Sequence, residues 1–210
     1  MDPLPASLPL PVAKKSQVRP YGQKAPFSRD DVAAVRARLA LGSRDRALFE
    51  LAISSALRAG DLLGLRAGDT QDGAGAIRTR AQLGQHKTGK SVLVNITPPA
   101  QEALAAHIET AKLEPTAYLF TAHRRRVAKP LTVEAFRQLV KGWADIAGHR
   151  DVSRFAAHST RRTLASVIYA ETKDVAAVRH VLGHSSTAAT SHYLGVDVDA
   201  ALDIARKHAL

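Results

Sequence analysis

Cysteine is absent from this chain of 210 residues, and acidic residues are scarce. Without cysteine the protein has neither disulfide bonds nor thiolate metal sites. No run of about 18 apolar residues occurs, which argues against a membrane-spanning helix. The start of the chain, Met1-Asp2-Pro3-Leu4-Pro5, lacks the positive charge and the apolar stretch of a secretory signal. These absences favour a cytoplasmic protein that does not engage a membrane.

Basic residues outnumber acidic ones, 30 Lys and Arg against 19 Asp and Glu, which gives a net charge of +11. Such a charge favours a polyanionic partner, because each phosphate that is neutralised releases counterions. Ribosomal and other RNA-binding proteins are basic too, so charge alone predicts a nucleic acid without saying which. The length and the 45% hydrophobic content suffice for one domain with a sizeable core, with or without an arm.

The first 26 residues differ in composition from the rest of the chain. They contain six of the ten prolines, at positions 3, 5, 9, 11, 20 and 26, and four basic residues, Lys14, Lys15, Arg19 and Lys24. This composition predicts an extended basic arm over 1–26, followed by a single domain over 27–210. Whether the arm lies along DNA, along a neighbouring subunit or in solvent stays open.

Helix-start signals recur along the domain, and one segment alternates like strands. Ser28 with Asp31 forms a capping-box pattern, and Ser43 is expected to cap a helix that carries apolar residues as far as Leu57. Residues 76–96 alternate around a Lys-Thr-Gly-Lys turn and predict two antiparallel strands. Further helices are expected to start at Thr97, which precedes two prolines, and at Thr132, where Leu131 can pack on Phe136. Another is expected to start at or near His158. Thr172 is expected to cap a short helix that Gly183 ends.

Four residues in the last third of the chain form a chemically specific set. His158 and Arg161 are three residues apart and share a helix face, while Tyr193 follows His184 by nine residues. A guanidinium binds two phosphate oxygens, imidazoles donate hydrogen bonds or move protons, and a phenol can act as the nucleophile. The set therefore fits attack of a tyrosine on a phosphodiester.

This arrangement resembles the catalytic domain of the tyrosine recombinases, the phage integrase family. Two upstream segments add to the resemblance: residues 56–65, Ala-Leu-Arg-Ala-Gly-Asp-Leu-Leu-Gly-Leu, look like the first-arginine segment, and residues 86–92, His-Lys-Thr-Gly-Lys-Ser-Val, look like the lysine hairpin. The resemblance extends from about Phe27 to about Ala205. It implies a mainly α fold with a small antiparallel β-sheet and six catalytic positions, Arg58, Lys87, His158, Arg161, His184 and Tyr193.

The resemblance also implies a role for each position. Tyr193 would form a 3′-phosphotyrosyl link, and Arg58 and Arg161 would hold the scissile phosphate and stabilise its transition state. Lys87 would protonate the departing 5′-oxygen, with Lys90 as the substitute candidate. His158 would handle a proton near the tyrosine, and His184 would donate a hydrogen bond to a non-bridging oxygen.

Several neighbouring residues have competing interpretations. Asp61 lies one helical turn after Arg58 and is expected to orient it, while Arg162 points about 100° away from Arg161 and is expected to be structural or to contact a backbone phosphate. The basic cluster 123–126 is either a solvated loop or a DNA-backbone contact. His180, His184 and His192 suggest a metal site, but Gly183 interrupts the helix and no cysteine or well-spaced acid completes a ligand set. We expect no metal and no cofactor.

The resemblance implies double-stranded DNA as the partner, and oligomerisation on DNA through the C-terminal tail, residues 196–210. The tail could equally pack on its own domain. Larger family members carry an additional helical domain before the catalytic one, so the sequence predicts a stand-alone catalytic domain. Whether an accessory protein replaces the missing clamp stays open. The leading functional hypothesis is a site-specific recombinase or integrase. The alternatives are a non-cleaving DNA-binding accessory protein on the same fold and a type IB topoisomerase.

Overall fold

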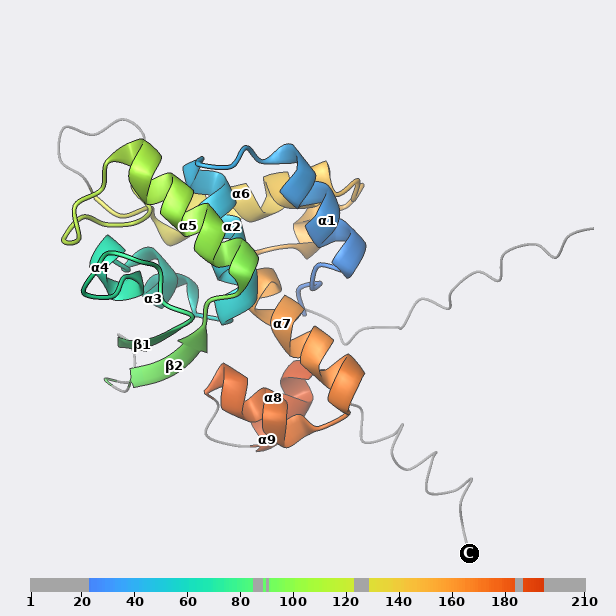
Figure 1. Ribbon diagram of the computed structural model, residues 1–210. Helices are drawn as coiled ribbons and strands as arrows, with labels where there is room; N and C mark the ends of the chain where they lie inside the picture. Colours follow the sequence, from blue (N-terminus) through green and yellow to red (C-terminus); the bar gives the residue numbers. More distant parts are fainter. Residues whose placement is uncertain (1–22, 85–88, 90, 123–128, 184–186, 195–210) are drawn as a thin grey trace, which may run out of the picture.

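The computed structural model describes residues 23–84, 89, 91–122, 129–183 and 187–194 (Figure 1). This part of the chain is mainly helical with one two-stranded antiparallel sheet, as the sequence predicts. In chain order its elements are α1 (Arg29–Arg38), α2 (Arg44–Ser55), α3 (Ala59–Leu63), α4 (Ala67–Thr70), β1 (Arg80–Gly84), β2 (Ser91–Asn95), α5 (Pro98–Ala111), α6 (Val133–Ile146), the 3-10 helix η1 (Val152–Arg154), α7 (Ala157–Thr172), α8 (Val175–Leu182) and α9 (Thr187–Leu194). None of the described helices is long and apolar enough to cross a membrane.

Helix α2 forms the centre of the molecule. Every residue from Ala47 to Ser55 is buried, which is the pattern of a helix packed on all sides. Helices α5 and α7 pack against it, and Phe49 meets the rings of Phe27 and Trp143 edge-on at centroid distances of 6.2 and 5.1 Å. Packing against α2 fixes the position of α7, the helix that carries His158 and Arg161.

The predicted helix starts are largely confirmed. Ser28 and Asp31 form the capping box of α1, and the Ser43 hydroxyl accepts a hydrogen bond from the Arg46 amide at 3.2 Å. Thr97 precedes the two prolines that open α5, and Thr132 caps α6 by accepting from the Ala135 amide at 3.1 Å. The caps at Ser28, Ser43 and Thr132 are local side-chain to backbone bonds, which is why the sequence reveals them, whereas Thr97 makes no side-chain cap bond.

Two expected helix limits are wrong. Helix α2 ends at Ser55 and not at Leu57, because Ala56 adopts a left-handed conformation with φ 51° and ψ 26°. Thr172 is the last residue of α7, and the cap of α8 is Asp174, which accepts a hydrogen bond from the Ala176 amide at 2.7 Å. The predicted end of α8 at Gly183 is confirmed, with φ 60° there.

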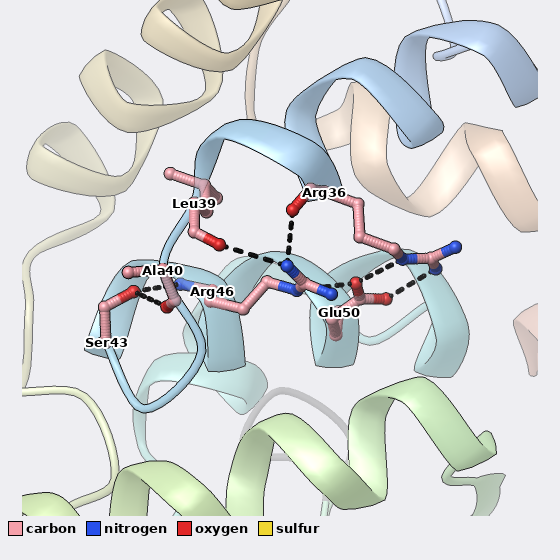
Figure 2. A network of polar contacts seen from close by, with 6 residues as sticks. All are labelled: Arg36, Leu39, Ala40, Ser43, Arg46 and Glu50. Atoms are coloured by element: carbon pink, nitrogen blue, oxygen red, sulfur yellow. Dashed lines mark hydrogen bonds and ion pairs between the residues drawn. The ribbon is translucent and has the colours of Figure 1, made fainter.

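A polar network fastens α1 to α2 (Figure 2). Glu50 is only 1% exposed, and its carboxylate accepts two hydrogen bonds from Arg36, at 2.7 and 2.8 Å, and one from Arg46, at 2.9 Å. Arg46 also donates to the carbonyl groups of Arg36 and, at 3.0 Å, of Leu39, where α1 ends. The network satisfies a buried charge and the last turn of α1 together.

The apolar residues form two clusters of unequal size. Among the described residues, the main cluster has thirty buried members and spans α1 to α6, the sheet and the segment up to Phe155. The second core, as we call the smaller cluster, contains four buried residues of the described chain, Ala56, Ala165, Val178 and Leu182. It holds α8 and α9 on α7, and Figure 1 shows this helix pair below α7, on the side away from α1 and α5.

Residues before α1 already pack on the domain. Ala25 is 5% exposed and its amide donates to the Arg154 carbonyl at 2.8 Å. Gln23 accepts a hydrogen bond from Arg162 Nη1 at 2.8 Å, and Phe27 donates from its amide to the Thr163 hydroxyl at 3.0 Å. These contacts tie the start of the described chain to α7. Residues 1–22 of the expected arm lie outside the described residues.

Candidate active site

Arg58 stands at the start of α3, immediately after the left-handed end of α2. Its backbone is extended, with φ −68° and ψ 147°, and its side chain does not cap the helix. The Nη1 atom is buried and, among the described residues, has no hydrogen-bond partner. A buried donor without a partner is costly, so an anion bound at this point would satisfy it.

Arg161 reaches from α7 into the junction between α2 and α8. Its side chain is only 5% exposed. Nη1 donates to the carbonyl of Ala56 and Nη2 donates to the carbonyl of Leu182, the last residue of α8. Since a guanidinium is planar, these two bonds fix the orientation of the Arg161 side chain in the site.

His158 lies one turn before Arg161 at the exposed start of α7. Loss of part of its hydration lowers the pKa of the imidazole, and the charges of Arg161, Arg162 and Arg58 lower it further. The effect of Arg58, which belongs to a different part of the chain, shows that the fold gathers these groups at one place. His158 is therefore a neutral imidazole among cationic groups at neutral pH, able to accept a proton.

The second core places Tyr193 in relation to this cluster. Tyr193 lies on α9, and its neighbour Leu194 packs against the second core together with Leu164 and Ile168 of α7. Helix α9 contacts both α7 and α8. The helix that bears the candidate nucleophile is thus docked directly on the helix that bears Arg161.

Asp61 and Arg162, which lie near Arg58 and Arg161 in the sequence, were expected to have supporting roles. Asp61 is buried in the first turn of α3, three residues after Arg58, which is the residue before the helix. Its expected role in orienting Arg58 stays a prediction. Arg162 is 7% exposed and binds Gln23, which fits the expected structural role.

Several candidate positions fall outside the described residues. They are Lys87 and Lys90 of the hairpin, the basic cluster 123–126, His184, and the tail 196–210. The flanking elements are nevertheless in place: β1 and β2 pair antiparallel from Arg80 opposite Asn95 to Gly84 opposite Ser91, and α8 ends just before Gly183. The predicted hairpin is therefore confirmed on both sides of its turn.

The metal alternative is tested only in part. Among the described residues, no group of three or more His, Asp or Glu side chains could hold a metal ion. His180 is exposed on α8, while His184 lies outside the described residues.

Two backbone groups of the site were not foreseen from the sequence. The carbonyls of Ala56 and Leu182 hold Arg161, yet a carbonyl group is common to all residues and leaves no sequence signal. A left-handed alanine gives no signal either, because glycine and asparagine are the residues expected in that conformation.

The anion site and the docked α9 helix agree with comparisons to known proteins. Residues 32–199 match the phage integrase family. The chain is 30% identical over 157 residues to "Probable integrase/recombinase YoeC" of Bacillus subtilis, covering 74% of this chain and 80% of that protein. It is 29% identical over 206 residues to tyrosine recombinase XerC of Rhodospirillum centenum, covering 97% of this chain and 58% of the relative.

Solved structures show the same fold. The crystal structure of XerA recombinase matches 91% of this chain and 66% of its own, with a TM-score of 0.67 and 20% identity. The XerH site-specific recombinase bound to its difH substrate matches 86% of this chain and 53% of its own, with a TM-score of 0.64 and 18% identity. The chain spans little more than half the length of XerC and XerH. By its match over most of its length, the chain belongs to the phage integrase family of tyrosine recombinases.

Proposed function

We propose that this protein is a site-specific DNA recombinase that cleaves and rejoins strands through Tyr193. The observation that carries the proposal is the convergence of Arg58, Arg161 and a neutral His158 beside the helix that bears Tyr193. Two guanidinium groups beside a proton acceptor fit a phosphodiester, and the buried Nη1 donor of Arg58 fits one of its oxygens. Double-stranded DNA is the proposed partner, in keeping with the net charge of +11.

The proposed reaction is a pair of transesterifications. The phenol oxygen of Tyr193 attacks phosphorus while His158 accepts the phenolic proton, and the bond from phosphorus to the 5′-oxygen breaks. That oxygen leaves as a 5′-hydroxyl with a proton from Lys87, and the 3′-phosphate stays on the tyrosine. Attack by the 5′-hydroxyl of another strand reverses the step and joins the new pair without an external energy source, because the covalent link conserves the phosphodiester.

The arginines and His184 are proposed to act on the phosphate itself. Arg58 and Arg161 stabilise the additional negative charge of the pentacoordinate transition state, and His184 donates to a non-bridging oxygen. Removal of a comparable electrostatic donor costs about 10²–10³ in rate. An unperturbed phenol has a pKa near about 10, so the cationic surroundings and the neutral His158 are also proposed to help Tyr193 ionise.

Covalent capture tests the proposal. Purified protein is incubated with fragmented DNA from its source, quenched in denaturant, and the DNA that stays attached is sequenced. The comparison is with Tyr193→Phe, which removes only the phenolic oxygen, and with Tyr169→Phe, which alters a tyrosine on α7 outside the site. Adducts at a recurrent sequence in the wild type and Tyr169→Phe, but not in Tyr193→Phe, are expected.

Other outcomes separate the remaining functions. DNA binding without any adduct would favour a non-cleaving accessory protein on this fold. Tyr193-dependent relaxation of supercoiled DNA without products that join two sites would favour a topoisomerase. Adducts that persist in Tyr193→Phe would show that another residue is the nucleophile.

A further inference from the structure

Arg161 is the point at which three separate parts of the site meet. It rises from α7, and its two terminal nitrogens bind the carbonyl groups that end α2 and α8. Ala56 lies two residues before Arg58, and Leu182 lies two residues before His184. The side chain that would hold the phosphate therefore also connects the chain segments that lead to two other candidate residues.

The Ala56 carbonyl owes its position to an unfavourable backbone conformation. A left-handed residue other than glycine is disfavoured sterically, and such residues persist only where their surroundings enforce them. Ala56 is 1% exposed, and its methyl group belongs to the second core with Val178 and Leu182. Packing of α8 on this methyl group and binding of Arg161 to the carbonyl therefore support the same backbone conformation.

Few other described contacts hold α8 and α9. Four described residues are buried in the second core, and the extensive contacts of both helices are with α7 and with each other. Hydrogen bonds from a charged donor are roughly twice as strong as neutral ones. The bond from Arg161 to the Leu182 carbonyl at the end of α8 is therefore a strong, buried link between α7 and the α8–α9 pair.

We infer that Arg161 is a positioning residue in addition to its proposed contact with the phosphate: by bridging the carbonyls of Ala56 and Leu182, it couples docking of the α8–α9 pair to the shaping of the arginine site. Docking of the helix that bears Tyr193 and alignment of the Arg161 side chain then occur together. When α8 and α9 detach, Arg161 loses its bond to the Leu182 carbonyl, so Arg161 is correctly oriented toward the phosphate only when the helix that bears Tyr193 is docked. The role of Tyr193 in this inference rests on the proposed function, whereas the bridge itself does not.

Hydrogen exchange measured by mass spectrometry tests the bridge without any DNA. The comparison is between wild type, Arg161→Lys and Arg58→Lys. A lysine keeps the charge but cannot span two carbonyls as a planar guanidinium does. Arg161→Lys is expected to speed exchange in peptides covering 175–183 and 187–194 by about tenfold or more, while α2, α5 and α6 keep wild-type protection.

Arg58→Lys is the matched control, because Arg58 has no hydrogen bond to α8 or α9 among the described residues. Its exchange in α8 and α9 should equal that of the wild type, although both variants should lose adduct formation if the proposed function is right. Unchanged exchange in Arg161→Lys would overturn the inference. Equal loss of protection throughout α2, α5 and α6 would overturn it too, since Arg161 would then be a general core residue.

Variants at Ala56 test the second anchor. Ala56→Gly accepts the left-handed backbone but removes the buried methyl group, so it should loosen α8 and α9 clearly less than Ala56→Val does. Ala56→Val disfavours that backbone, because a β-branched side chain rarely adopts it, and should loosen α8 and α9 as Arg161→Lys does. If the two variants exchange alike, the carbonyl of Ala56 does not position Arg161. If the exchange results hold but the wild type forms no adduct, the proposed function fails and the bridge stands.

Discussion

At the residue scale, His158 makes the most direct link between electrostatics and activity. Its pKa lies below the ordinary 6.5 because the imidazole loses hydration and three guanidinium groups oppose its protonation. Adduct formation should therefore stay level as pH falls from about 8 to 6.5, and should decline only when His158 becomes protonated below that pH. A pH profile of the single-turnover rate checks this.

Substitution of His158 should remove this acidic decline. His158→Asn is expected to lower the rate about 10²–10⁴-fold and to leave its remaining pH dependence flat in this range. His180→Asn, which alters an exposed histidine of α8, should keep the wild-type profile. An acidic decline that survives in His158→Asn would assign the titration to a different group.

The same shift has a consequence for stability, and its sign follows from proton binding. In the unfolded chain His158 regains its ordinary pKa and binds a proton first as pH falls, so the folded state loses stability below about 6.5. Urea unfolding at about pH 7.5 and 5.5 should show a larger loss for the wild type than for His158→Asn. Equal losses would mean that the fold does not depress this pKa.

At the element scale, two threonines at helix starts offer a matched pair. The Thr132 hydroxyl accepts a hydrogen bond from the Ala135 amide, whereas Thr97 precedes α5 without a side-chain cap bond. Thr132→Ala should therefore lower the free energy of unfolding by about 1 kcal/mol, and Thr97→Ala by only a few tenths. Denaturant titration of both variants measures the difference, and equal losses would show that the cap bond contributes nothing.

The buried carboxylate between α1 and α2 should matter more than either cap. Glu50→Gln removes the charge that two arginines surround, and should lower the free energy of unfolding by about 3 kcal/mol, the low end for a buried pair because Arg36 is partly exposed. Glu134→Gln, which breaks an exposed ion pair with Arg137, should change it by about 0–1 kcal/mol. Comparable losses in the two variants would contradict the importance given to burial.

The elements also show how far the sequence alone reaches. Ser28, Ser43 and Thr132 were predictable as caps because each accepts a hydrogen bond from the amide three residues later. The cap of α8 was misplaced from Asp174 to Thr172, since both residues are good caps and Thr172 still accepts a hydrogen bond from the Asp174 amide at 3.1 Å. The early end of α2 was missed because it depends on packing and on Arg161, which is 105 residues away.

At the scale of the whole molecule, the site depended on the family resemblance and not on local pattern. Arg58 and Arg161 approach one another through contacts between α2, α7 and α8 that no sequence spacing encodes. The resemblance predicted this meeting, but it did not predict that Arg161 would bind two backbone carbonyls. The chain carries the recognisable side chains, and the fold supplies the backbone groups that hold them.

The net charge of +11 belongs to the entire molecule, and it predicts that DNA binding depends strongly on salt concentration. If cationic side chains neutralise DNA phosphates, the logarithm of the binding constant should fall linearly with the logarithm of salt concentration. A protein that makes about 6–10 phosphate contacts loses about 10³–10⁵ in affinity between 50 and 200 mM salt. Fluorescence anisotropy with a labelled duplex measures the slope.

Tyr193→Phe is the control for this measurement, since removing an uncharged phenolic oxygen alters no phosphate contact made by a cation. Its slope should parallel the wild-type slope, whereas Arg58→Gln should reduce the slope by about one phosphate contact. A flat salt response in the wild type would remove electrostatic attraction as the basis of binding. A parallel slope in Tyr193→Phe, with adducts lost, would separate the surface that binds DNA from the oxygen that cleaves it.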